Sequence, residues 1–548
     1  MMRSLTWLIP FSLALAAASC NDSDGPPASN GVPNPDAGAG GSAARAGAGG
    51  TSSTAGKAGA GGSVTGAGAP GAGATAEAGS APVSEGGSAG MDDSEGGAAG
   101  APPDVNPFDG SCATLPGTVV YIESGDTQEN LLKNLGRHLR DTANITLAFN
   151  LTGSCTLASD MYAYTSAGTK VVKSGTLKYI PSTAEDSTWT PAMAEPTCTT
   201  GADGIPIDVA ISALFVDSCS NLAAKPASLA LIQGPVQAYT FVVPTGSQQT
   251  AIWSQEARYA FGLGANNPLS PTYNPWNDEQ FMFIRPVTKS TLVATALNIE
   301  LLPSLWKGQK KDMSSDVVTA VKGSTKPLAT IGILGAEVYD SNRQNGIKTL
   351  AFQAKNQAAA YYPDSTSTSF DKQNVRDGHY TLWSPTVYIA PVDGSQVPTN
   401  PAVKYLVDLV QGTTATPPHG TSFDALKDIA KVGLVPDCAM QVTRATDGGN
   451  LTPFTPAQSC RCAYLSKVPE ALAVPTGCTA CTSSNQCAGG SCNFGFCEPD
   501  AVSTAGTTPS GCFSGTPTTH QQLINACSSA QSIVKPVTLP AGDPLPIP

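Results

Sequence analysis

The stretch Thr118-Val-Val-Tyr-Ile-Glu-Ser-Gly-Asp-Thr-Gln-Glu-Asn-Leu-Leu132 joins a β-branched and aromatic run to a short polar loop and the start of a helical pattern. The run Thr118–Ile122 predicts a buried strand. Leucines at positions 131, 132, 135 and 139 then recur at helical spacing. Asp126 and Glu129, three residues apart, match a capping box, so the predicted helix begins at Asp126. The unit is therefore strand, loop, helix.

Similar units follow along the chain. Ile145–Phe149 leads into the loop Leu151-Thr-Gly-Ser-Cys155, and Ile207–Ile211 ends at Ser212. Further strand runs are Tyr239–Val243 and Phe281–Ile284, the second followed by Arg285-Pro-Val-Thr-Lys-Ser-Thr291 and a helical pattern. Strands separated by helices predict an α/β fold with a mainly parallel sheet. Because parallel strands end at the same edge of a sheet, we expect the polar loops to converge there.

This order of strands and polar loops resembles the extracytoplasmic solute-binding proteins of the type II periplasmic fold, and most of all the phosphate-binding protein of the phosphate ABC importer. The resemblance covers about residues 118–389. In that family a first strand leads into a Ser/Thr loop that caps a helix, and a second strand ends in a Gly-Ser loop. A third strand ends in Ala-Ser-Asp, and an Arg precedes Ser-Gly-Thr at a fourth helix start.

The matching positions here carry two departures from the family pattern. Ala213 stands where the family has the Asp, and Ser290 stands where it has the central Gly. The ligand-binding residues that the resemblance implies are Ser124, Gly125, Thr127, Thr152, Gly153, Ser154, Ser212, Arg285, Lys289, Ser290 and Thr291.

Loops of this kind bind oxyanions for a physical reason. The first turn of a helix exposes unpaired N–H groups and the positive end of the helix dipole, and Ser and Thr hydroxyls add donors. A guanidinium adds two donors in a fork, which makes Arg285 the foremost candidate for an anion contact. The alternative is that Arg285 forms a surface or interlobe ion pair and that the hydroxyls only cap helices.

The family fold has two lobes between which the chain crosses twice. Ala238-Tyr-Thr-Phe241 and Tyr380-Thr-Leu-Trp-Ser-Pro385 resemble those crossings. The resemblance therefore implies a discontinuous first lobe of residues 104–238 and 385–437 and a second lobe of residues 239–384. A ligand in the cleft would shift an equilibrium between open and closed lobes.

The N-terminus predicts export and lipidation. Arg3, an apolar stretch and the small residues Ala16-Ala-Ala-Ser19 precede Cys20, the order of a signal peptide over residues 1–19. A cysteine at this place resembles the lipobox of bacterial lipoproteins, although the usual Leu three residues before it is absent. Residues 20–103 are dominated by Gly, Ala and Ser and predict a disordered tether. We expect the protein in the cell envelope, lipid-anchored to the inner or outer membrane and facing the periplasm or the cell surface.

The cysteines support an oxidising compartment. The chain has 15 cysteines, and an even number remains once Cys20 carries lipid. Ten of them lie between Cys438 and Cys527 and predict a disulfide-rich C-terminal module over residues 438–548, with zinc as the less favoured alternative. In the first lobe, a bridge between Cys155 and Cys219 would hold two candidate ligand loops in place. Spacing alone leaves the pairing open.

Composition and motifs exclude several function classes. A net charge of −12 with few basic clusters argues against nucleic acid as a partner. The four histidines lie outside any recognisable catalytic motif, so we expect no enzyme. No cofactor motif and no metal site are predicted.

The favoured function is thus a lipid-anchored extracytoplasmic solute-binding protein for a small oxyanion such as phosphate. An ABC permease or another envelope protein would be its partner. The alternative is a surface structural or interaction lipoprotein that has kept the fold without binding a transported ligand. Ala213 cannot accept the proton of hydrogen phosphate, and Asp126 would compete for the N–H groups that an anion needs if it caps its helix.

Overall fold

The structure is a computed structural model and describes residues 108–166, 172–272, 274–412, 417–421, 423–498, 511–537 and 545. The predictions for the signal peptide, Cys20 and the tether lie outside these residues. Contacts group Ala98–Pro548 into one unit, so both lobes are described together. Within the described residues we find no helix with the length and apolar character needed to cross a membrane.

The opening stretch folds as strand, turn and helix. β1 (Thr118–Gly125) leads through a 3-10 turn (Asp126–Gln128) into α1 (Glu129–Ala143). The four leucines of α1 are at most 1% exposed, which confirms the face predicted from their spacing. α1 ends at Asn144, whose left-handed backbone (φ 53°) lets its N–H bond to the Leu139 carbonyl.

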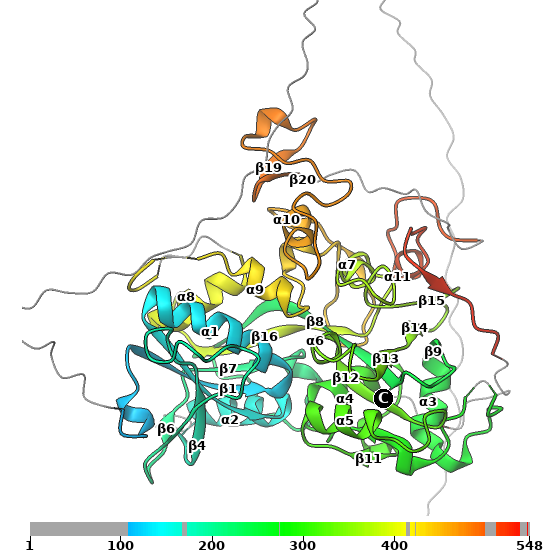
Figure 1. Cartoon of the computed structure of the whole chain (residues 1–548), viewed down its shortest axis with the longest axis horizontal. Helices are drawn as coiled ribbons and strands as arrows, with labels where there is room; N and C mark the ends of the chain where they lie inside the picture. The colour runs from blue at the N-terminus through cyan, green and yellow to red at the C-terminus, as the bar shows by residue number, and fades with distance from the viewer. Residues whose placement is uncertain are drawn as a thin grey trace, which may run out of the picture. The chain divides into compact units, whose positions relative to one another are not determined.

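The first lobe is a sheet with helices on both faces. β1 lies between β2 and β7, which run parallel to it. Buried side chains of α1, α8 and α9 pack on one face of the sheet, and those of α2 pack on the other; Figure 1 shows α1 and α8 opposite α2. Because β1, β2 and β7 end at one edge, the loops after them are neighbours. The bounds are β2 (Ile145–Thr152), α2 (Ser154–Ser166), β7 (Val209–Ser212), α8 (Pro401–Val410) and α9 (Leu426–Lys431).

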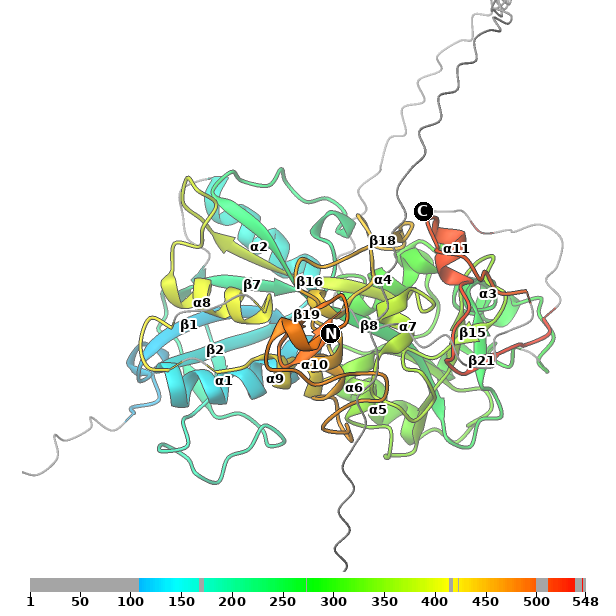
Figure 2. The same cartoon turned by 90° about the horizontal axis from the view of Figure 1, so that it is seen from above.

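Two long strands connect the lobes. β8 (Leu229–Pro244) pairs over its first part with β16 (Trp383–Pro391) and over its second part with β12 of the second lobe, antiparallel in both cases. Figure 2 shows β8 and β16 between the two lobes. The predicted crossings near Ala238 and Trp383 lie in these strands. β8 and β16 pair antiparallel with their neighbours. The sheet is therefore mixed, and the prediction of a mainly parallel sheet is wrong.

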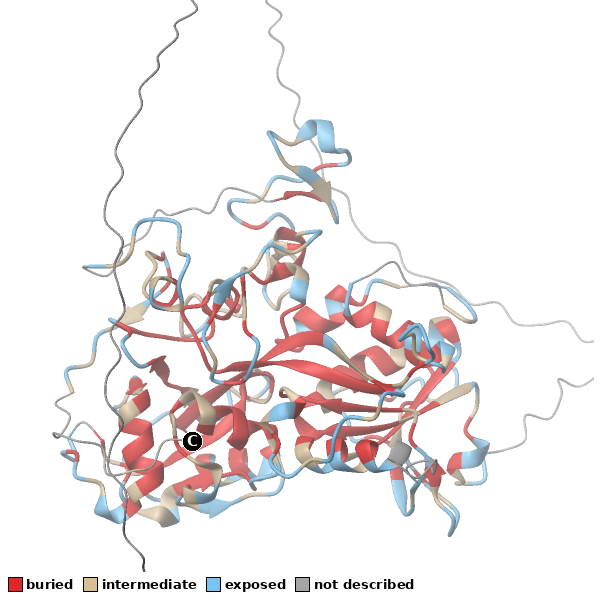
Figure 3. Cartoon of the chain, turned by 180° about the vertical axis from the view of Figure 1, so that it is seen from behind, coloured by how far each residue is buried: buried red, intermediate tan, exposed pale blue. Residues whose placement is uncertain are grey.

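The second lobe repeats the α/β arrangement. β10 lies between β11 and β12, parallel to both, and β12 pairs with β8. Its aromatic core includes Phe241, Phe261 and Trp276, and Figure 3 shows the central strands as buried. A smaller sheet has the order β21-β15-β14-β9. The bounds are β9 (Ala251–Trp253), α3 (Ser254–Leu263), β10 (Met282–Ile284), α4 (Ser290–Asn298), β11 (Gln309–Lys310), α5 (Ser314–Lys322), β12 (Ile331–Gly335), α6 (Ala336–Asp340), β13 (Ile347–Thr349), β14 (Ala351–Gln353), β15 (Ala360–Tyr361) and α7 (Gln373–Asp377).

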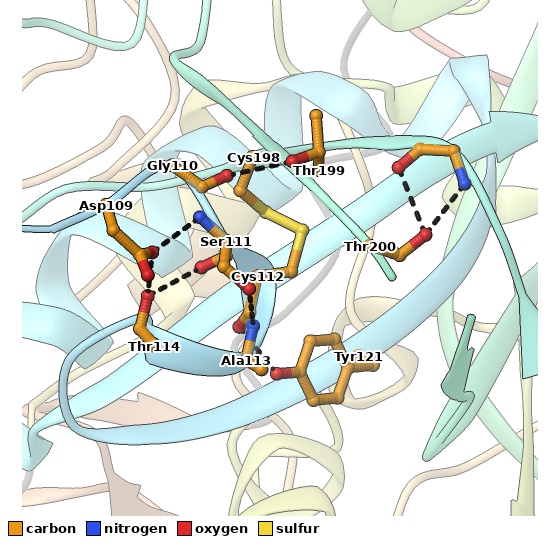
Figure 4. Close-up of a disulfide and its surroundings, with 11 residues drawn as sticks. Asp109, Gly110, Ser111, Cys112, Ala113, Thr114, Tyr121, Cys198, Thr199 and Thr200 are labelled. Atoms are coloured by element: carbon orange, nitrogen blue, oxygen red, sulfur yellow. Dashed lines mark hydrogen bonds between the residues drawn. A yellow bond between two sulfur atoms is a disulfide. The ribbon is translucent and has the colours of Figure 1, made fainter. Parts of the chain in front are cut away.

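Seven disulfides join the 14 cysteines of the described residues. Cys112 pairs with Cys198 and holds the N-terminal turn Cys112–Thr114 against the strand β5 (Thr197–Thr199), where the Thr199 hydroxyl also donates to the Gly110 carbonyl at 3.3 Å (Figure 4). Cys155 pairs with Cys219, the bridge considered from the sequence. The other pairs are 438–460, 462–478, 481–492, 487–497 and 512–527. Cys478 and Cys481 have different partners, so they do not form a zinc pair.

The disulfide-rich C-terminal segment packs on the second lobe. Its apolar residues, among them Met440, Leu451, Tyr464 and Phe496, belong to the same core cluster as Phe241. A segment with few large apolar residues thus gains stability from both its disulfides and this shared core. The remaining elements are β3 (Val172–Lys173), β4 (Thr176–Tyr179), β6 (Ile205–Pro206), β17 (Val442–Thr443), β18 (Thr452–Pro453), α10 (Arg461–Leu465), β19 (Ser491–Asn493), β20 (Phe496–Glu498), α11 (His520–Ile524) and β21 (Ser532–Ile533).

Candidate functional site

The three loops of the first lobe lie against one another. Ser154 Oγ accepts a hydrogen bond from the Ala213 N–H at 3.1 Å, which ties the second loop to the third. A Cβ placed on Gly125 would lie 3.6 Å from Thr127 Oγ and 3.7 Å from Ser154 Oγ, so the first loop adjoins the second. Ser212 Oγ bonds within its own loop, to the Leu214 backbone. The predicted convergence of these loops is confirmed.

The loop at the start of α4 in the second lobe meets the same place. Lys289 Nζ donates to the Thr152 carbonyl at 3.1 Å, and the Cys155 N–H donates to the Thr288 carbonyl at 3.2 Å. Gly153 packs so closely here that an added Cβ would be 2.6 Å from Thr288 O. Val293 of α4 also packs on Leu214 and on the bridged Cys219. The lobes are therefore in direct contact.

Arg285 crosses this junction and binds a carboxylate of the first lobe. Its side chain is 0% exposed, and Nη2 donates to both Asp126 carboxylate oxygens, each at 2.9 Å. Nη2 also donates to the Asp312 carbonyl at 2.7 Å, and Nη1 donates to Ser314 Oγ. The N–H and hydroxyl of Ser314 each lie 2.9 Å from Asp126 Oδ2 as donors. The Asp126 carboxylate thus sits at the N-terminus of α5, on the other lobe.

The predicted capping role of Asp126 is wrong. α1 begins at Glu129 without a side-chain cap, and the carboxylate points away from its own helix. Arg285 Nη2 offers a charge-assisted donor and Ser314 adds a backbone N–H and a hydroxyl, a stronger set of donors than the first turn of α1. Asp126 does accept from an N–H group that an anion would need, as expected, but this N–H belongs to Ser314 at the start of α5 and not to α1.

The charges around Asp126 favour its ionised form. Burial alone would raise the pKa of Asp126, but Arg285 and then Lys289, 3.7 Å from Oδ1, outweigh it and the pKa is lowered. Burial lowers the pKa of Lys289, although the nearby Asp126 carboxylate acts to raise it. Burial raises the pKa of Glu337 well above its usual range, and Asp126 adds to the rise. The surroundings therefore favour the neutral form of Glu337 and the ionised form of Asp126.

Three polar groups of the site are buried and have no hydrogen-bond partner among the described residues. They are Thr127 Oγ, Thr291 Oγ and Arg285 Nε. Thr127 is 2% exposed and Thr291 is 1% exposed, and they belong to opposite lobes. Buried polar groups are nearly always paired in native proteins, so these three atoms are candidates for contact with a polar ligand.

A cavity of about 290 Å³ opens beside the ion pair. Asp126 and Ser314 form part of its wall, together with Glu129 and Asn130 of α1 and residues of α5 and α6. Asn130 Nδ2 lies 3.5 Å from Ser341 Oγ across the lobes. The cavity therefore reaches the Asp126 carboxylate from the side of α1.

Two residues of the junction were not identified from the sequence. Ser314 starts α5, and its signal was available, since Ser314-Ser315-Asp316 precedes the apolar pair of Val317 and Val318 as at many helix starts. Asp447 is buried and accepts from the Phe215 N–H at 3.0 Å and from Ser218 Oγ at 2.7 Å. Asp447 follows β17 in an ordinary turn sequence, so only the tertiary structure shows where it lies.

Comparison with known proteins gives structural likenesses only. No protein-family model matches the chain. No curated protein matches it either. An ABC-type phosphate transport receptor from Vibrio cholerae is similar at 11% identity and a TM-score of 0.36, over 58% of this chain and 99% of the receptor.

Two further likenesses are weaker. PstS from Borrelia burgdorferi is similar at 10% identity and a TM-score of 0.32, over 58% and 98% of the two chains. The reduced OxyR regulatory domain from Pseudomonas aeruginosa gives 9% identity and a TM-score of 0.30, over 53% and 96%. The fold itself, two α/β lobes joined by β8 and β16, is the one that the resemblance to type II solute-binding proteins implied.

Gly153→Ala should weaken the contact between the lobes. The new Cβ would meet Thr288 O at 2.6 Å, and overpacking of this kind typically costs about 1–3 kcal/mol. Thermal unfolding should show the loss. Gly201→Ala is the control, because nothing lies within 4 Å of its Cβ position. Equal stability of the two variants would contradict the close packing at Gly153.

The ion pair should make interlobe stability depend on pH at the acidic end. The pKa of Asp126 is lower in the folded state than in the unfolded state, where it is about 3.9. The ionised carboxylate therefore stabilises the folded protein fully above the unfolded-state pKa, and this stabilisation is lost as the pH falls through the folded-state pKa. Asp126→Asn should cost about 3–5 kcal/mol at pH 7. In denaturant unfolding, the difference in the free energy of unfolding between the wild type and Asp126→Asn should become smaller below about pH 4. A difference that stays constant down to about pH 2 would contradict a stabilising role for the ionised Asp126 carboxylate.

Proposed function

We propose that this chain is an extracytoplasmic binding protein for a small oxyanion such as phosphate. The ligand binds between the lobes, and lipid on Cys20 holds the protein at the membrane. An ABC permease or another envelope protein receives the closed, ligand-bound form. The chain binds rather than converts its ligand.

The observation that carries this proposal is the unpaired set of donors at the junction. The hydroxyls of Thr127 in the first lobe and Thr291 in the second are buried without a hydrogen-bond partner among the described residues, and so is Arg285 Nε. Hydroxyls and a guanidinium N–H are the donors that an oxyanion uses. The N-terminus of α4, which begins at Ser290, lies at the same place and adds the positive end of a helix dipole.

The connection between the lobes suits a closing movement. β8 and β16 are the only strands among those described that pair within the first lobe and continue to the second. A bulge interrupts their pairing between Pro385 and Val387, and bulges bend strands. A ligand bound to both lobes would favour the closed arrangement by its difference in affinity for the two states.

Thr127→Val combined with Thr291→Val tests this function. Neither hydroxyl makes a hydrogen bond within the described structure, so the double variant should fold with unchanged or slightly higher stability. If both hydroxyls contact the anion, its affinity should fall at least tenfold, since a lost hydrogen bond to a charged group costs about 1.5–3 kcal/mol. Calorimetry of the full chain with phosphate, sulfate and nitrate in an otherwise anion-poor buffer measures both properties.

Thr386→Val is the matched control. Its hydroxyl is also buried and unpaired among the described residues, but it lies in β16, facing Gly234 rather than the ligand loops. The control should bind anions as the wild type does. If no anion binds to the wild type, or if all three proteins bind equally, the proposed ligand site is wrong.

A further inference from the structure

The environment of the Asp126 carboxylate is that of a bound anion. One guanidinium, one backbone N–H at the start of a nine-residue helix and one hydroxyl donate to it, and an ammonium lies 3.7 Å away. Binding sites for free oxyanions use this same combination of donors. All of the donors belong to the second lobe, whereas Asp126 belongs to the first.

We propose that Asp126 is a tethered substitute for the anionic ligand, which occupies the Arg285 site and holds the lobes closed until a free anion displaces it. This inference rests on the proposed function and adds its regulation. The closed arrangement is then a property of the empty protein. A free anion competes with a group that is already in place.

The position of Asp126 in the chain makes the competition strong. It lies next to Thr127, whose unpaired hydroxyl is one of the proposed ligand groups. A group held by a short tether acts at an effective concentration in the mM range, so it lowers the apparent affinity of a free competitor. The protein would therefore respond only where the anion is abundant.

The cavity beside the ion pair gives the displaced carboxylate a place to go. Asp126 and Ser314 both line this space of about 290 Å³, so it is the nearest space for the carboxylate once an anion replaces it at Arg285. Its wall also carries Asn130, whose Nδ2 lies beside Ser341 Oγ. Departure of the carboxylate frees Arg285 Nη2, the Ser314 N–H and the Ser314 hydroxyl for an incoming anion.

Asp126→Asn is the direct test. The amide keeps the size of the carboxylate but removes its charge, so Arg285 and Lys289 are left without the anion that they surround. We expect the variant to bind phosphate or sulfate at least tenfold more tightly than the wild type in calorimetry. Small-angle scattering in phosphate-free buffer should show a larger radius of gyration for the variant, and added phosphate should restore the wild-type value.

Asp364→Asn controls for general loss of stability. Asp364 is 3% exposed and pairs with Lys372 at 2.9 Å and Arg343 at 3.4 Å, all within the second lobe. This control should unfold more easily but keep the wild-type anion affinity and radius of gyration.

Unchanged anion affinity in Asp126→Asn overturns the proposal, even if that variant opens. This failure differs from a failure of the proposed function. If the wild type binds phosphate and Asp126→Asn binds it equally well, the solute site stands and the substitute role falls. If the wild type binds no anion, the proposed function falls, and displacement of Asp126 by a free anion falls with it, even where Asp126→Asn binds.

Discussion

The ion pair between Asp126 and Arg285 joins the two lobes at the point where their polar loops meet. Both groups are almost fully buried, so neither could remain charged there without the other. Ser314 completes the arrangement with two donors to the same carboxylate. The close contact at Gly153 and the bond from Lys289 to the Thr152 carbonyl depend on the same closed arrangement.

This pairing reconciles two features that would otherwise conflict. The junction has the donors of an oxyanion site, with Thr127 and Thr291 still unpaired in the described structure, yet its guanidinium is occupied from within the chain. A tethered carboxylate explains both, because it accepts from Arg285 Nη2 and leaves the hydroxyls of Thr127 and Thr291 without a partner among the described residues. Anion binding then becomes an exchange of partners at Arg285, in lobes that Asp126 already holds together.

The sequence predicted the two-lobed α/β fold, but not the pairing at the junction of the lobes. Strand runs and polar loops placed Gly153, Ser154 and Arg285 together, because strand ends share an edge of the sheet. The capping box at Asp126 failed, since local spacing cannot show that Arg285, 159 residues away, offers stronger donors. Asp447 was missed for the same reason. The mixed sheet and the shared core of the C-terminal segment also depend on tertiary pairing that no local pattern encodes.

Crystals of the mature chain, grown without phosphate or sulfate and then exposed to phosphate, would test the central claim most directly. We predict that electron density at the Arg285 guanidinium shows the Asp126 carboxylate before exposure. Afterwards it should show a tetrahedral anion at the guanidinium, with the carboxylate turned into the adjacent cavity. Phosphate bound elsewhere, with the ion pair intact at saturation, would contradict the account.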